Sequence, residues 1–156
     1  MRRTKIAIVA AVAALLVATA SAQAAPQTTV LNVREFVIGS SADCIFTVSG
    51  PLLEATGAPT GSFEACVKEF NSSTEPFYSQ TSVQEIAYTL PGGTIFATVR
   101  THELLVTPSR LTYAAKGEIT GGTGIYNGAT GRIVGNGIIG FASGIDANIH
   151  FILQVR

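Results

Sequence analysis

Short apolar runs and alternating apolar and polar positions recur along the chain after its first 25 residues, separated by turn residues and with little sign of a helical period. β-Branched residues dominate these runs, which favours strands over helices. The fold class is therefore predicted to be all-β, and we expect the polar stretch 71–81 to be the longest loop. The pattern predicts eight strands: Thr29–Gly39, Cys44–Gly50, Phe63–Lys68, Val83–Leu90, Thr94–His102, Leu111–Thr120, Gly131–Ala142 and Ala147–Val155.

Eight short strands in an open sheet would leave unpaired edges that recruit other chains, and closing the sheet into a barrel removes those edges. Ten of the 16 glycines lie between Gly117 and Gly144, where bends and close backbone approach would let coiled strands close the sheet. We therefore expect an eight-stranded antiparallel closed β-barrel of the calycin-like type, whose interior holds side chains or one small ligand. A two-sheet sandwich needs a similar number of strands and is the alternative.

The first 24 residues have the three parts of an export signal. Basic residues among the first five precede the apolar run Ile6–Ala18, and Ala22-Gln23-Ala24 supplies a small-x-small cleavage pattern. The alternative, a membrane anchor, is weaker because the apolar run is shorter than the about 20 residues that span a bilayer. We expect a signal peptide over 1–24, a single domain over 25–156, and a secreted protein with no membrane attachment after cleavage.

Composition excludes several classes of protein. With 47% hydrophobic and 13% charged residues, the chain does not have the composition of a disordered tail. Seven basic and ten acidic residues follow the signal, so the mature chain has a net charge of −3, which argues against a nucleic-acid partner. The two histidines, His102 and His150, lack metal-ligand spacing, and we expect no metal site.

The two cysteines, Cys44 and Cys66, lie 22 positions apart in a chain that is predicted to leave the reducing cytosol. We expect them to form a disulfide. Such a cross-link contributes roughly 3 kcal/mol on the chain-entropy model. The alternative, a reactive thiol, requires a nearby histidine or helix N-terminus, which the local sequence does not offer.

The segment Ile119–Gly131 reads I-T-G-G-T-G-I-Y-N-G-A-T-G and is the most distinctive motif of the chain. It resembles the signature turn of the allene oxide cyclase-like and dirigent-like β-barrels, in which one strand runs into this stretch and the next begins at its last glycine. The glycines permit positive φ and tight backbone approach, so we interpret the motif as a structural turn. A phosphate cradle is the weaker interpretation, because no helix pattern follows. The predicted turn residues are Gly121, Gly122, Gly124, Tyr126, Gly128 and Gly131.

The resemblance implies how such a barrel would act. Allene oxide cyclases steer a reactive epoxide into one ring-closed stereoisomer, and dirigent proteins orient radicals that a separate oxidase makes; neither uses a cofactor. It implies an exported barrel that binds a small hydrophobic molecule and guides its cyclisation or coupling by confinement. Two alternatives stay open. One is a carrier without turnover; the other is a non-enzymatic secreted module that acts through its outer surface, as a monomer or a homo-oligomer.

Alternation along the strands offers a guide to the interior. Tyr88 and Tyr113 fall on the more apolar faces of their strands and are candidate substrate-binding residues, with core packing as the alternative role. In Thr94–His102 two faces compete, so Arg100 is either an interior cation that anchors a ligand or a solvated residue outside. No local motif assigns a catalytic residue.

Overall fold

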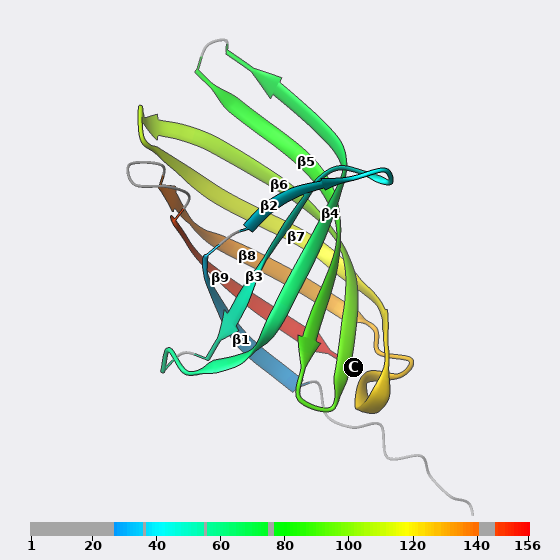
Figure 1. The fold of residues 1–156 in the computed structure, drawn as a ribbon. Helices are drawn as coiled ribbons and strands as arrows, with labels where there is room; N and C mark the ends of the chain where they lie inside the picture. The colour runs from blue at the N-terminus through cyan, green and yellow to red at the C-terminus, as the bar shows by residue number, and fades with distance from the viewer. Residues whose placement is uncertain (1–26, 36, 55, 75–76, 141–145) are drawn as a thin grey trace, which may run out of the picture.

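A computed structural model describes residues 27–35, 37–54, 56–74, 77–140 and 146–156, and nearly all of them lie in antiparallel strands (Figure 1). The predicted signal peptide, residues 1–24, lies outside the described residues. A single 3₁₀ turn, η1 (Gly124–Tyr126), interrupts the strands. The strands are β1 (Gln27–Glu35), β2 (Val37–Ser41), β3 (Cys44–Leu53), β4 (Pro59–Ser73), β5 (Ser79–Leu90), β6 (Gly93–Thr107), β7 (Arg110–Gly122), β8 (Gly131–Gly140) and β9 (Asp146–Val155).

All nine strands belong to one sheet, in the order β1-β9-β8-β7-β6-β5-β4-β3-β2. From β3 to β9 each strand pairs with the next one along the chain, so this part of the sheet is a series of hairpins. The first strand pairs with β9 and also meets β3 at two residue pairs, Asn32 with Leu53 and Val33 with Leu52. β1 therefore pairs with β9 along most of its length and meets β3 at two residue pairs.

The prediction of an all-β fold is confirmed, and the two-sheet sandwich is wrong for the described strands. The strand count needs correction from eight to nine, because the segment predicted as Thr29–Gly39 forms two strands with different partners, β9 for β1 and β3 for β2. The loop predicted over 71–81 is also wrong over most of its length. There β4 runs to Ser73 and β5 starts at Ser79, since the backbones pair beyond the apolar residues, as in Asn71 with Thr81.

The buried side chains lie on one face of the sheet. In β5, β6 and β7 every second residue is buried, as the pleat of a strand requires. These buried residues join others from β3, β4, β8 and β9 in a single hydrophobic cluster (Tyr88, Leu52, Ile133 and Leu153 among them), which shows that the sheet curls around its own inner face. Helices play no part in covering that face in the described residues.

The glycine-rich motif forms the turn between β7 and β8 and docks on the β5–β6 turn. The Ile125 amide donates to the Gly92 carbonyl over 3.0 Å, and the Thr123 amide donates to the Thr94 carbonyl over 2.8 Å. Gly124 has a φ of +60°, and a Cβ there would lie 2.0 Å from the Gly92 oxygen. This position therefore requires glycine both for its φ and for close approach. Figure 1 shows η1 at the same end of the sheet as the β5–β6 turn.

The expectation of positive φ in the first glycines of the motif is wrong for two of them. Gly121 and Gly122 are the last residues of β7 and have extended backbones, whereas positive φ occurs later in the motif, at Gly124, Gly128 and Gly131. Tyr126 is partly buried and packs against the hydrophobic cluster.

The disulfide prediction is confirmed. Cys44 and Cys66 form a bond with an S–S distance of 2.03 Å, which joins β3 to β4 near the register pair of Phe46 and Val67. A disulfide fits a protein that folds outside the reducing cytosol. In the described part of the chain, no helix has the length and apolar character needed to cross a membrane.

Candidate functional site

Polar side chains occupy inner-face positions at one end of the sheet, the end away from the glycine-rich turn. Ser82 and Gln84 on β5, and Thr101 and Glu103 on β6, are each at most 8% exposed. They continue the inner faces that carry Ile86 on β5 and Val99 on β6. The register of the two strands aligns them, because Ser82 pairs with Thr101, and Gln80 pairs with Glu103.

A chain of hydrogen bonds connects this polar cluster, which we define as Gln80, Ser82, Gln84, Thr101 and Glu103. The Gln84 amide donates to Ser82 Oγ over 2.9 Å, and the Ser82 and Thr101 hydroxyls share a hydrogen bond of 2.7 Å. Thr101 Oγ1 reaches Glu103 Oε1 at 3.5 Å, and Gln80 Nε2 donates to Glu103 Oε2. Buried polar groups of this kind are tolerated because they satisfy one another.

Glu103 is the titratable member of the polar cluster. Burial raises the pKa of its carboxyl above the ordinary glutamate value, because removal from water disfavours the charged form. Hydrogen bonds from Gln80 and Thr101, and the charge of His102, oppose this rise without cancelling it. Burial thus makes this carboxyl easier to protonate than an exposed glutamate, and its two oxygens accept the hydrogen bonds from Gln80 and Thr101.

Tyr113 and Tyr88 both point to the inner face, as predicted. Tyr113 pairs in register with Glu103 and is 6% exposed, and Tyr88 is fully buried. Burial raises the pKa of both phenols well above the ordinary tyrosine value, and the Glu103 charge raises the pKa of Tyr113 further. Both side chains therefore stay neutral and can offer a hydroxyl to a neighbouring group.

On the strands beyond β6, small residues lie in register with members of the polar cluster. Across β6, β7 and β8, Thr101 is followed by Ala115 and Gly135. In the next row, Tyr113 is followed by Gly137. The inner face of β8 thus carries no side chain beyond Cα at two successive inward positions, Gly135 and Gly137.

Arg100 lies on the opposite face of β6 from the polar cluster and is exposed. Its interior placement, one of the two possibilities for this residue, is therefore wrong, because Ile95, Ala97 and Val99 take the inner positions of the strand. The structure brings Tyr113 and Tyr88 into one interior and separates Arg100 from them. His102, on the same face as Arg100, is also exposed.

Sequence reasoning missed the whole polar cluster. The predicted strand ends at His102, one residue before Glu103, and the pattern leaves open which face of Thr94–His102 is the inner one. The alternation itself carries the signal: Ile95, Ala97 and Val99 lead directly to Thr101 and Glu103 at the same spacing. Continuing this alternation past Val99 would have placed Thr101 and Glu103 on the inner face.

Comparison with known proteins finds no match: no family model, curated protein or solved structure is similar to this chain. Within the described ranges, no group of three or more histidine, cysteine, aspartate or glutamate side chains could hold a metal ion.

Proposed function

We propose that the protein is exported and binds a small, mainly hydrophobic molecule on the inner face of the sheet, with a polar group of that molecule at the polar cluster, and that it guides cyclisation or coupling of the molecule by confinement. The observation that carries this proposal is a buried, hydrogen-bonded carboxyl at one end of an otherwise apolar interior. Sites for small ligands combine a mainly apolar lining with a few placed polar groups, and the inner face has this composition.

The proposal includes a closed barrel of the allene oxide cyclase-like or dirigent-like type. Two features support closure: the pairing of β1 with β3, and the single hydrophobic cluster that joins residues of β3 to residues of β9. The hairpin order of β3 to β9 and the glycine-rich turn before β8 are consistent with that family resemblance. A closed barrel would also protect the sheet edges without an additional layer.

The chemistry of the polar cluster defines the ligand class. The Glu103 carboxyl and the hydroxyls of Ser82, Thr101 and Tyr113 provide hydrogen-bond donors and acceptors. They suit an epoxide, carbonyl or phenol oxygen. An apolar body would extend toward Ile95 and Leu90. Holding a flexible substrate in one conformation without water would favour one stereoisomer of the product.

Binding can be tested with cis-parinaric acid, a fluorescent polyunsaturated fatty acid. We expect a saturable rise in its fluorescence with the mature protein. Ala115→Leu should abolish this rise, because the added side chain enters the row between Thr101 and Gly135. Ala114→Leu is the matched control: it adds the same volume to the exposed face of the same strand.

A second variant keeps the test decisive if Ala115→Leu fails to fold. Glu103→Gln preserves the shape of the side chain and removes the titrating carboxyl, so it should fold and change the affinity for the fatty-acid carboxyl. Equal binding by wild type, Ala115→Leu and Ala114→Leu would contradict an inner-face site. No saturable signal with the wild type would contradict it as well.

Turnover needs a separate assay. Purified protein would be incubated with unsaturated fatty-acid epoxides, and with phenols plus a one-electron oxidant, and the enantiomer ratio of the products would be measured by chiral chromatography. We expect a ratio that departs from one, and a smaller departure with Glu103→Gln. If all products were racemic but cis-parinaric acid still bound, the protein would be a carrier. Guidance of those reactions would then be excluded.

A further inference from the structure

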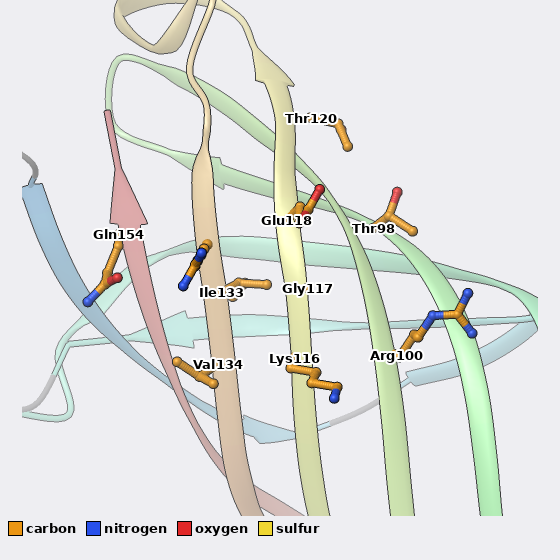
Figure 2. Close-up of a pocket in the computed structure, with 10 residues that line it drawn as sticks. Thr98, Arg100, Lys116, Gly117, Glu118, Thr120, Ile133, Val134 and Gln154 are labelled. Atoms are coloured by element: carbon orange, nitrogen blue, oxygen red, sulfur yellow. The ribbon is translucent and has the colours of Figure 1, made fainter.

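The outer face of the sheet has a hollow of ≈ 740 Å³ across β6, β7, β8 and β9. Its lining includes three basic residues, Arg100, Lys116 and Arg132, and one acidic residue, Glu118. Figure 2 shows Arg100 on β6 and Lys116 on the neighbouring strand β7, with Glu118 two positions further along β7. This surface lies on the opposite side of the sheet from the polar cluster and is independent of the proposed function.

The register of the sheet sets like charges side by side in this hollow. Arg100 pairs directly with Lys116, and the same row continues to Val83 on one side and Val134 on the other. The row therefore sets two cations side by side, and its acidic member, Glu69 on β4, is separated from Arg100 by Val83. Directly opposed like charges on neighbouring strands destabilise a sheet, so this arrangement is unfavourable unless an anion lies between them.

The acidic residue of the hollow does not neutralise this pair. Glu118 belongs to the adjacent row, where it pairs with Thr98 and with Arg132. Among the described residues, the ion pair with N–O contact below 4.0 Å is Lys68 with Glu85, on β4 and β5 outside the hollow. Within the described residues, no ion pair of this kind involves Arg100 or Lys116.

We propose that this hollow binds a soluble, doubly charged oxyanion, as inorganic phosphate or as a phosphate monoester. The Arg100 guanidinium can donate two parallel hydrogen bonds to such a group, and the Lys116 ammonium supplies a second charge beside it. Thr98, Thr120 and Gln154, which also line the hollow, offer neutral donors. The three basic residues and one acidic residue of the lining give it a net positive charge, which complements the two negative charges of a dianion.

The test is a titration of the mature protein with inorganic phosphate, followed by calorimetry, at an ionic strength held constant with sodium chloride. We expect saturable binding by the wild type. Arg100→Gln and Lys116→Gln should each weaken it about fivefold or more, because each removes one charge-assisted contact. The double variant should show no measurable binding. Arg110→Gln is the matched control, since it removes an exposed arginine from β7, the strand of Lys116, outside the hollow.

A second readout does not depend on affinity. Without phosphate, Lys116→Gln should raise the melting temperature, because it relieves the repulsion of Arg100, and the stabilisation that phosphate gives the wild type should be lost in this variant. Equal phosphate binding by the double variant and Arg110→Gln, or the same effect from chloride alone, would overturn the proposal. Retention on phosphatidylglycerol vesicles without any binding of inorganic phosphate would also overturn it, in favour of a lipid surface.

Discussion

The two ends of the inner face are built from the same hairpin of β5 and β6 and carry opposite chemistry. At the end beside the glycine-rich turn, the inner positions hold Leu90 and Ile95. At the other end they hold Ser82, Thr101 and Glu103, which are equally buried. The register between β5 and β6 continues without interruption from one end to the other, so the chemical contrast comes from the side chains.

The hydrogen bonds that connect the strands and turns also differ between the two ends. Beside the glycine-rich turn, η1 is bonded through its main chain to the β5–β6 turn, at Gly92 and Thr94. At the polar end, side chains connect the strands, as in the bond between Ser82 and Thr101. We infer that the turn end supplies most of the stability, and that the polar end supplies groups that a ligand can contact.

The largest effect is expected at the apolar end, from Ile95→Ala. Ile95 is 1% exposed, and truncation of a buried isoleucine costs about 2–5 kcal/mol, because contacts are lost and a cavity remains. Urea unfolding followed by circular dichroism would measure the loss. Phe96→Ala is the control: the neighbouring ring is 41% exposed, and its removal should cost much less. Similar losses for both variants would contradict the assignment of the two faces of β6.

Gly124→Ala should have the next largest effect. A positive φ alone costs a residue with a Cβ roughly 1–2 kcal/mol, and here the Cβ would also lie 2.0 Å from the Gly92 oxygen. Gly128→Ala separates the two causes, because Gly128 has a φ of +75° and a methyl group there would have nothing within 4 Å. The unfolding free energy should fall further for Gly124→Ala than for Gly128→Ala. Equal losses would mean that η1 does not depend on close contact with the β5–β6 turn.

The inner face of β7 could be predicted from the sequence, and the inner face of β6 could not. Leu111–Thr120 alternates cleanly, since Leu111, Tyr113 and Ala115 face a core and the residues between them face solvent. The same reasoning failed in Thr94–His102. Its outer face carries Phe96 and its inner face continues into Thr101 and Glu103, so polarity no longer distinguishes the faces.

The strand ends were missed for a related reason. In the β4–β5 hairpin, Asn71 pairs with Thr81 and Ser73 pairs with Ser79, where both faces are largely polar. Backbone hydrogen bonds hold such an extension without an apolar period, so a pattern of hydrophobicity cannot reveal it. The division of the first predicted strand was hidden as well, because it follows from two different partners, β9 and β3, that local sequence does not specify.

Glu103→Gln tests the titration of the polar end. The raised pKa means that the folded protein holds a proton that the unfolded chain releases above the ordinary glutamate value of 4.5. The carboxyl therefore favours folding fully at low pH, and its contribution decreases as the pH rises from about 4.5 through the folded pKa. The slope is at most about 1.4 kcal/mol per pH unit for one group.

Unfolding free energies of the wild type and Glu103→Gln, measured from about pH 4 upward to about pH 8, would show this difference. We expect the wild type to lose stability relative to the variant as the pH rises. Glu118→Gln is the control, because it removes an exposed carboxyl from the opposite face of the sheet. A wild-type advantage that grows with pH would mean that Glu103 is favoured as a carboxylate, and that the polar end attracts a cation rather than a neutral oxygen.

The smallest effect concerns the 2.7 Å hydrogen bond between Ser82 and Thr101. Thr101→Val keeps the shape of the side chain and removes the hydroxyl, which should cost about 1 kcal/mol, the usual net contribution of such a bond. Thr98→Val, at an exposed position of the same strand, should change stability by less than about 0.5 kcal/mol. Combining Thr101→Val with Ser82→Ala completes a double-mutant cycle, and the two effects should not add, since each variant removes the same bond. Additive effects would show that the polar residues act singly. In that case a connected hydrogen-bond network would not hold Glu103 in place at the polar end. The two ends would then differ only in the composition of their side chains.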